Sequence, residues 1–291
     1  MRDQAESLRM RMLETQGNLG RSIAVVSGKG GVGKSNFSTN FATMLAKRGK
    51  KVILVDMDIG MGNIHILMGK SVSTSLRDYL QGDQLLEEVI AEGPFGLQYI
   101  SGGSGMSSLL EWSDEMFERL IHAFEELQKS FDYILFDMGA GITNWALDLL
   151  LSVDEIVVIS TAEPTSITDA YSMMKYIHLK DSDKQFYVLC NRTFSKEEGL
   201  ETLNRLKATM KNFLGKDVIV LGSLPEDPVV RKAVREQVPF SIAYPDALIT
   251  KTLHLIAARF IEQRDGEIYG YEQTSSKFLS KLKSIFSKGR D

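Results

Sequence analysis

The stretch "SGKGGVGKS", Ser27 to Ser35, is the strongest structural signal in this sequence. It fits the spacing G-x-x-x-x-G-K-[ST], follows a β-rich run and opens a segment of helical period. Glycines at these places let backbone amides converge on phosphate groups, and the N-terminus of the helix adds partial positive charge. Lys34 would meet the outer phosphate oxygens, and the Ser35 hydroxyl would reach Mg²⁺. The stretch predicts a nucleotide-binding loop that joins a strand to a helix.

The pattern on either side of this loop predicts the fold. Short apolar runs alternate with longer segments of helical period, as in a parallel sheet covered by helices on both faces. Strands are expected at 22–27, 51–56, 97–101, 133–137, 155–160, 185–191 and 218–224. Helices are expected at 34–48, 113–129, 143–151, 166–177, 198–214 and 246–263. We expect one α/β domain over 21–264, built on a doubly wound, mostly parallel sheet of the P-loop NTPase type.

Composition and the chain ends narrow the class of protein. The 291 residues carry a formal net charge of -4, which argues against non-specific binding to nucleic acid as the main activity. The N-terminus lacks the apolar core of a secretory signal, and no apolar run approaches the ~18 residues of a membrane span. We therefore expect a cytoplasmic protein. Beyond the domain, 265–276 loses the apolar period and is expected to be a linker.

Acidic residues stand at two expected strand ends. "VDMDIGMGN" places Asp56 at the end of one strand and Asp58 two residues later, and "YILFDMGAG" places Asp137 at the end of another. Ligands of open α/β sheets bind at the carboxyl edge, where these side chains would meet. A helix cap is the alternative role for any one of them.

The pattern K-G-G-x-G-K-[ST], Lys29 to Ser35, resembles the deviant phosphate loop of the MinD and ParA ATPases. The resemblance implies an ATP-dependent homodimer in which Lys29 reaches the partner's nucleotide, as an arginine finger acts in trans. It also implies that Asp56 supports Mg²⁺ through water, together with Ser35. Asp58 would orient the attacking water, and Asp137 would serve as the Walker B carboxylate. Catalytic roles therefore fall to Lys29, Asp58 and Asp137.

Further nucleotide contacts come from the same resemblance. Asn191 and Arg192 end a strand in "CNR", and "LPEDPVVRKA", Leu224 to Ala233, is similar to the loop that closes over adenine. The guanine-selecting pattern N-K-x-D does not occur, since "NRTF" stands at Asn191 to Phe194, so ATP is favoured over GTP. The expected nucleotide-binding residues are Gly28, Lys29, Gly30, Gly31, Val32, Gly33, Lys34, Ser35, Asn36, Asn191, Arg192, Pro225, Glu226 and Asp227.

Two other branches of this family are disfavoured. An iron–sulfur reductase dimer needs two cluster cysteines per subunit, and Cys190 is the single cysteine of the sequence. A bacterial tyrosine kinase carries a C-terminal tyrosine cluster, whereas only Tyr269 and Tyr271 lie near one another here. Membrane-associated and DNA-partition ATPases remain.

The C-terminal segment 277–291 predicts an amphipathic membrane-targeting helix. In "SKFLSKLKSIFSK" an apolar stripe is edged by Lys281, Lys283 and Lys288, as in helices that lie on anionic lipid. The residues expected to enter the membrane are Phe278, Leu279, Leu282, Ile285 and Phe286. The alternative is a last helix packed on its own domain. One copy per subunit would let dimerisation control membrane residence at the inner face of the cell membrane through avidity.

The N-terminal stretch "DQAESLR", Asp3 to Arg9, is similar to the motif that begins the flagellar-number ATPases of the FlhG (FleN/YlxH) family, a branch of the MinD ATPases. The resemblance implies that residues 1–20 stimulate the GTPase FlhF, a relative of the signal-recognition GTPases. The expected contacts are Asp3, Gln4, Leu8 and Arg9. A frayed terminal helix is the alternative.

Together these features predict a membrane-associating ATPase with weak intrinsic turnover that uses ATP and Mg²⁺. It would control flagellar number or placement with FlhF and with proteins of the flagellar C-ring and switch complex. A ParA-like ATPase that partitions DNA or cargo, and a MinD-like regulator of the division site, stay open as alternatives. A nucleotide-gated interaction scaffold with negligible turnover would differ from this ATPase only in the rate of ATP hydrolysis.

Overall fold

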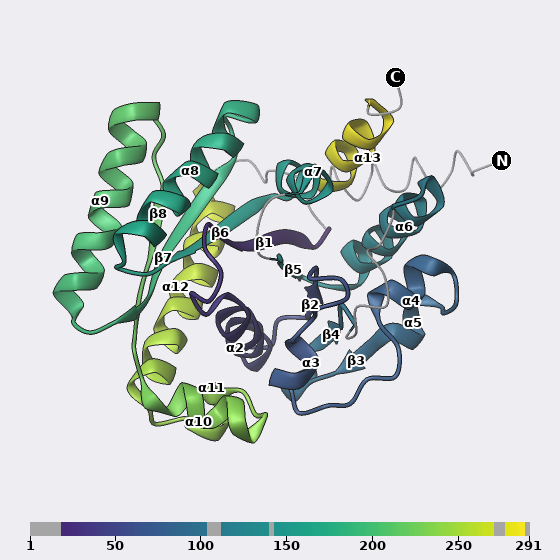
Figure 1. The fold of residues 1–291 in the computed structure, drawn as a ribbon, viewed down its shortest axis with the longest axis horizontal. Coiled ribbons are helices and arrows are strands. Elements are labelled where there is room, and N and C mark those ends of the chain that lie inside the picture. Colours follow the sequence, from purple (N-terminus) through teal and green to yellow (C-terminus); the bar gives the residue numbers. More distant parts are fainter. Residues whose placement is uncertain (1–18, 104–111, 140–142, 271–276, 289–291) are drawn as a thin grey trace.

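The computed structural model describes residues 19–103, 112–139, 143–270 and 277–288. Its strands form one eight-stranded sheet in the order β3-β4-β2-β5-β1-β6-β7-β8, in which only β3 and β4 pair antiparallel (Figure 1). The strands are β1 (Arg21–Ser27), β2 (Val52–Asp56), β3 (Ile90–Glu92), β4 (Gln98–Ile100), β5 (Tyr133–Asp137), β6 (Glu155–Ser160), β7 (Gln185–Thr193) and β8 (Ile219–Pro225). The expected doubly wound, mostly parallel sheet is confirmed.

Alternate residues of each central strand face two separate cores. In β1, Ile23 and Val25 belong to one core, while Ala24 and Val26 belong to the other. Both faces are covered, so these strands read as continuous apolar runs. The first core is covered by α2 (Lys34–Lys47), α3 (Ile64–Leu67), α10 (Pro228–Glu236), α11 (Phe240–Ala243) and α12 (Leu248–Gly270). The second is covered by α4 (Leu76–Gln81), α5 (Leu86–Val89), α6 (Asp114–Ser130), α7 (Asn144–Ser152), α8 (Pro164–Lys180), α9 (Lys196–Leu214) and α13 (Phe278–Lys288).

The structure corrects the first half, 265–270, of the expected linker. Helix α12 continues to Gly270, so the segment 265–270 is helical and not a tether. Ile261 is 8% exposed and is the last buried residue of α12 among those whose side chains the structure describes. Residues 271–276, the rest of the expected linker, lie outside the described residues.

The C-terminal helix α13 packs on its own domain. Phe278, Leu279 and Leu282 are 0%, 3% and 0% exposed and join the second core, against α6 and α7. Ile285 is half-buried. This structure therefore agrees with the alternative interpretation, in which the segment is a last helix that packs on its own domain. No helix among the described residues is long and apolar enough to cross a bilayer.

Candidate nucleotide site

The glycine-rich loop lies between β1 and α2, as the motif requires. Gly33 precedes the first residue of α2 with φ of 90°, in the left-handed region, and a Cβ there would lie 2.4 Å from Asn191 Nδ2. Gly28 packs equally closely, since its Cβ would lie 2.3 Å from the carbonyl carbon of Asp169 in α8. Both positions therefore require glycine. Gly30 and Gly31 are exposed, whereas Val32 is buried beneath the loop.

Lys34 points across the start of α2 to the end of β5. Its Nζ donates to Asp137 Oδ1 at 2.9 Å, and the two side chains are 11% and 2% exposed. Ser38, one turn further along α2, donates to the same oxygen at 2.8 Å. Ser35 follows Lys34 in the first turn of the helix. Ser38 was missed from the sequence, although its i+4 spacing from Lys34 places both on one helical face.

Asp56 and Asp137 are brought together by strand register. β2 and β5 are parallel, and Asp56 pairs with Asp137 at their carboxyl ends. Asp56 is 1% exposed and accepts hydrogen bonds from the backbone amides of Asp58, Asn63 and Ile64 at 3.1, 2.9 and 3.2 Å. Burial, followed by the charge of Asp137, raises the pKa of Asp56 to about 7. Two buried carboxylates at one edge form a site that a divalent cation would stabilise.

Asp58 lies where two loops meet. Its carboxylate is beside Gly139, where a Cβ would be 3.5 Å from Asp58 Oδ1. The loop that carries Asp58 is held by the segment after β4, because Gly60 and Gly62 donate to the carbonyls of Gly102 and Gly103, each at 2.9 Å. The segment after β4 therefore supports the Asp58 loop.

Lys29 points away from the phosphate loop of its own chain. Its Nζ donates to Glu163 Oε2 at 2.8 Å and to Thr165 Oγ1 at 3.3 Å, beside the N-terminus of α8. The side chains of Lys29 and Glu163 are 42% and 60% exposed. The hydrogen bond from Lys29 lowers the pKa of Glu163. Lys34 alone of these two lysines therefore reaches the acidic edge of the site within this chain.

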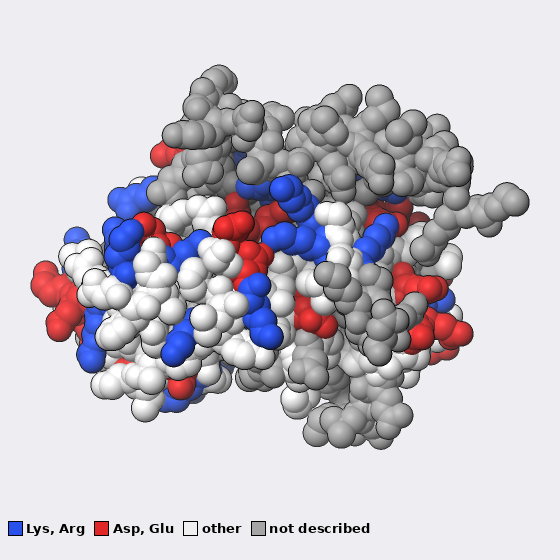
Figure 2. All heavy atoms as spheres, turned by 90° about the horizontal axis from the view of Figure 1, so that it is seen from above, with Lys and Arg blue, Asp and Glu red and all other residues white. Residues whose placement is uncertain are grey.

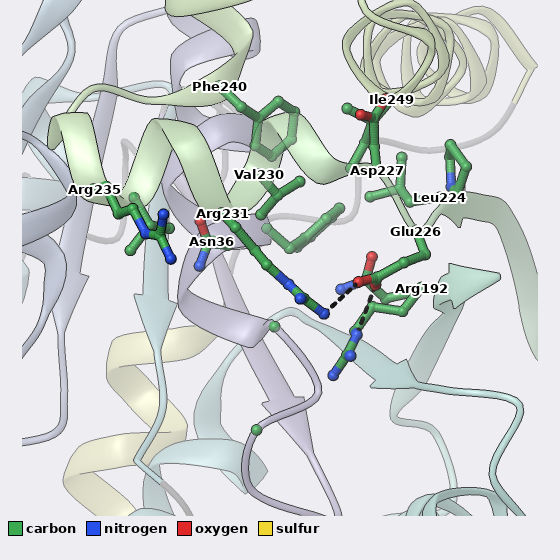
Figure 3. A pocket seen from close by; sticks show the side chains of 16 residues that line it. Asn36, Arg192, Leu224, Glu226, Asp227, Val230, Arg231, Arg235, Phe240 and Ile249 are labelled. Carbon is green, nitrogen blue, oxygen red and sulfur yellow. Dashed lines mark hydrogen bonds and ion pairs between the residues drawn. The ribbon is translucent and has the colours of Figure 1, made fainter. Parts of the chain in front are cut away.

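A cavity of about 420 Å³ lies beside the loop, where a base would bind (Figure 3). Asn191 donates through Nδ2 to the carbonyl of Val32 at 2.8 Å, which ties the end of β7 to the loop. Arg192 and Arg231 both point toward Glu226, with nitrogen–oxygen distances of 2.8 and 3.4 Å. The cavity is lined by Gly31, Gly33, Asn36, Phe37, Asn191, Arg192, Leu224, Pro225, Glu226, Asp227, Val230, Arg231, Val234, Arg235, Phe240 and Ile249.

This cavity brings together most of the predicted base contacts and several residues that the sequence did not indicate. Asp227 lines the cavity but also caps α10, because its Oδ1 accepts from the amide of Val229 at 3.1 Å. Phe240 and Ile249 provide an apolar wall from segments remote from the loop. The exposed surface of the cavity is mainly apolar although several of its lining residues are charged, and such a surface would fit the flat face of a purine. Asp3, Gln4, Leu8 and Arg9 lie outside the described residues.

Similarity to known proteins agrees with this geometry. The family model described as "ParA: NUBPL iron-transfer P-loop NTPase" matches residues 18–261. The antiactivator FleN of Pseudomonas aeruginosa is 33% identical over 81% of this chain and 85% of its own length. The flagellum site-determining protein YlxH of Helicobacter pylori is 34% identical over 86% of this chain and 84% of its own.

Solved structures show the same fold. The cell division ATPase MinD of Pyrococcus furiosus superposes with a TM-score of 0.69 at 25% identity, covering 84% of this chain and 99% of that one. MinD of Pyrococcus horikoshii, complexed with Mg-ADP, gives 0.69 at 26% identity, covering 85% and 98%. With the matched loop, the paired carboxylates and the base cavity, these similarities place the chain in the MinD and ParA family of P-loop ATPases, in the branch that contains FleN and YlxH.

Proposed function

We propose that the protein is an ATP-dependent dimerising ATPase that associates reversibly with membrane and controls the number or placement of flagella. One observation carries the proposal: the lysine-edged helix α13 packs against the strand that ends in Asp137. The ring of Phe278 lies 5.7 Å from that of Phe136, the residue before Asp137 in β5. The nucleotide site and the candidate membrane helix are therefore both in contact with β5. The name of the relative YlxH, a flagellum site-determining protein, supplies the link to flagella.

The residues of this chain suit ATP with Mg²⁺. Asp56 and Asp137 would hold the cation, directly or through water, with the Ser35 hydroxyl. Mg²⁺, when bound, would neutralise charge on the phosphates. Lys34 would exchange its bond with Asp137 for the outer phosphate oxygens. Asp58, which lies beside Gly139, would orient a water molecule for in-line attack.

Lys29 would complete the site of a second copy. Its ammonium is held on the surface by Glu163 and Thr165, so it is available to a partner facing the loop. A cation that arrives only when two subunits enclose nucleotide makes dimerisation and hydrolysis one event, and turnover by the monomer would be slow.

Membrane binding would require α13 to leave the domain. Its buried Phe278, Leu279 and Leu282 are the side chains that would enter lipid, so the docked and membrane-bound states exclude each other. Exchange of Lys34 for Mg²⁺ at Asp137 would act on β5, whose Phe136 contacts Phe278, and would disturb the docking of α13. Avidity of two helices in the dimer would then favour lipid.

FlhF and proteins of the flagellar C-ring and switch complex are the proposed protein partners, with the segment Asp3 to Arg9 as the contact for FlhF. The localisation proposed is cytoplasmic, with reversible attachment to the inner face of the cell membrane.

On the face shown in Figure 2, the described basic side chains lie interspersed with acidic ones and form no wide basic surface suited to DNA.

Co-sedimentation with vesicles tests the proposal. The full chain should pellet with anionic vesicles in ATP and stay in solution in ADP, and the chain ending at Ser276 should stay in solution in both. DNA replaces the vesicles in a parallel arm. Pelleting with DNA but not with vesicles in ATP would favour the partition ATPase instead.

A further inference from the structure

Two ion pairs hold the docked helix α13 at its edges. Lys281 Nζ donates to Asp181 Oδ2 at 2.8 Å, at the C-terminal end of α8. Lys283 pairs with Glu125 of α6. Residues two apart in an α-helix point about 200° apart, so the two lysines leave α13 on opposite sides. The helix is therefore clamped from both flanks of its apolar face.

The carboxylates of the two ion pairs are mostly buried, whereas the lysines are about half exposed. Lys281 and Asp181 are 41% and 20% exposed, and Lys283 and Glu125 are 51% and 18% exposed. Burial acts to raise the pKa of Asp181. The hydrogen bond from Lys281 and the charges of Lys184 and Lys281 outweigh it, so the pKa falls below its usual value. Asp181 therefore presents a negative charge to α13 at neutral pH.

Anionic lipid would compete for the same two ammonium groups. An interfacial helix buries its apolar stripe among acyl chains while flanking lysines meet phosphate groups. In the docked state the stripe faces Phe124 and Phe136, with ring centroids 5.6 and 5.7 Å from that of Phe278. The flanking lysines meet carboxylates. The domain thus offers α13 the same two features as a membrane surface, an apolar face and negative charge on either side.

We propose that Asp181 and Glu125 are positioning residues that set how readily anionic lipid draws α13 from the domain. This inference rests on the membrane role proposed above, and it adds the residues that regulate it. Each pair is partly exposed, with its ammonium group the more exposed partner, so removal of one carboxylate should raise the undocked fraction about two- to fivefold, equivalent to ~0.4–1 kcal/mol.

Glu125 is the better of the two for an experiment. Asp181 also lies 3.9 Å from the ammonium of Lys184, which is buried and donates to the carbonyls of Leu151 and Val153. Its replacement would disturb that group as well. Glu126, the neighbour of Glu125 on α6, pairs with Lys129 at 2.8 Å within the same helix. Glu125→Gln and Glu126→Gln therefore make the same charge change beside each other, and only the first removes a contact to α13.

The first measurement needs no lipid. Trypsin cuts a helix only when it opens, so the rate of cleavage after Lys281 and Lys283 reports undocking of α13. In the full chain, Glu125→Gln should raise this rate about two- to fivefold, while Glu126→Gln leaves it at the wild-type value. The charge-exchanged pair Glu125→Lys with Lys283→Glu should restore slow cleavage, observed at the remaining site, Lys281. Equal rates for Glu125→Gln and the wild type would overturn the clamp.

The second measurement uses vesicles of phosphatidylcholine with phosphatidylglycerol, without nucleotide. Glu125→Gln should reach half-binding at about two- to fivefold less lipid than Glu126→Gln, and vesicles of phosphatidylcholine alone should bind both variants more weakly. The charge-exchanged variant should bind less than the wild type, because Lys283→Glu removes a cation that lipid would attract.

The two measurements separate this proposal from the membrane role. Faster cleavage of Glu125→Gln without binding of any variant to vesicles would contradict the membrane role and, with it, the competition with lipid. Vesicle binding by the wild type, with Glu125→Gln and Glu126→Gln alike in both measurements, would keep the membrane role and reject the clamp.

Discussion

The ammonium of Lys34 and the carboxylate of Asp137 are 2.9 Å apart, across the site where the phosphates of ATP would lie. Both side chains are nearly buried, so the pair neutralises two charges that would otherwise be costly. When ATP and Mg²⁺ bind, the phosphates would replace Asp137 as the partner of Lys34, and Mg²⁺ would replace Lys34 as the partner of Asp137. Nucleotide binding would therefore act on the loop and on β5 together.

The two lysines of the loop should behave differently when replaced. Lys34→Ala removes the cation that faces the outer phosphates and leaves Asp137 without its ion pair, so ATP binding should be lost. Lys29→Ala removes an exposed contact to Glu163, so the monomer should keep its stability and still bind ATP. It should stay monomeric and inactive. Size-exclusion chromatography with ATP checks this, and a stable Lys29→Ala dimer with normal turnover would rule out a role in trans.

Asp58→Ala should separate binding from hydrolysis. Asp56 and Asp137 remain for Mg²⁺, and the loop stays anchored by Gly60 and Gly62, which use only backbone groups. The variant should bind ATP, dimerise and remain on vesicles, since a water molecule is no longer oriented for attack. Phosphate release and vesicle pelleting are the measurements. If Asp58→Ala cannot bind ATP, the carboxylate serves the nucleotide or the metal instead.

Phe278 should contribute to the stability of the whole domain. Its side chain is 0% exposed and contacts the rings of Phe124 and Phe136, so Phe278→Ala should lower the free energy of unfolding by about 3 kcal/mol. Phe213→Ala is the control, because Phe213 is 75% exposed and its loss should cost within ~0.5 kcal/mol. Urea unfolding of both variants gives the comparison. Similar small effects would mean that α13 spends little time docked in solution.

Lys184 should make stability depend on pH in the alkaline range. Burial first, and then the charge of Lys281, lower its pKa from 10.5 to about 8. Between these values the unfolded chain binds more protons than the folded one, so the contribution of Lys184 to stability rises with pH. The rise from pH 7 to pH 9.5 should be about 2 kcal/mol.

Urea unfolding of the wild type and of Lys184→Met at the two pH values isolates this effect. The wild type should gain relative to the variant as pH rises, whereas Lys180→Met, at an exposed position of α8, should follow the wild type. If the free energies of unfolding of the wild type and of Lys184→Met differ by the same amount at both pH values, Lys184 titrates near its usual pKa.

The N-terminal stretch should act without the ATPase domain. A peptide covering Asp3 to Arg9 should stimulate GTP hydrolysis by the cognate FlhF, and Gln4→Ala or Arg9→Ala should weaken it, since a polar or cationic group near the γ-phosphate promotes such turnover. Removing residues 1–9 from the full chain should leave its ATPase activity and vesicle binding intact. An FlhF that binds GTP but ignores saturating peptide would leave the flagellar role without this support.

Local signals predicted the parts of the structure that depend on nearby residues. β5 and β6 begin and end where their apolar runs do, and the loop of Gly28 to Ser35 stands between a strand and a helix as expected. β3 was missed because Ile90–Glu92 is three residues long and pairs at the sheet edge, where no buried run is needed. α10 begins at Pro228 within a stretch that the sequence indicated only as a loop.

Local patterns in the sequence could not predict the tertiary contacts. Nothing near Lys29 in the sequence indicates that Glu163 would hold it, and Phe240 reaches the base cavity from a segment far from the loop. The amphipathic pattern of α13 predicted that Phe278, Leu279 and Leu282 share one apolar face, and all three are buried, while the side chain of Phe286 lies outside the described residues. The same pattern suits a membrane and a protein surface alike, so the choice between them needed the positions of Phe124 and Phe136.

The burial of Cys190 has a practical consequence for spectroscopy. Its thiol is 0% exposed, and burial raises its pKa to about 11, so thiol reagents at neutral pH should leave it unmodified in the folded protein. The sequence has no other cysteine. A cysteine introduced at one exposed position of α13 and another on α9 could therefore carry a dye pair in the otherwise native chain, and energy transfer between the dyes would follow the departure of α13 in real time.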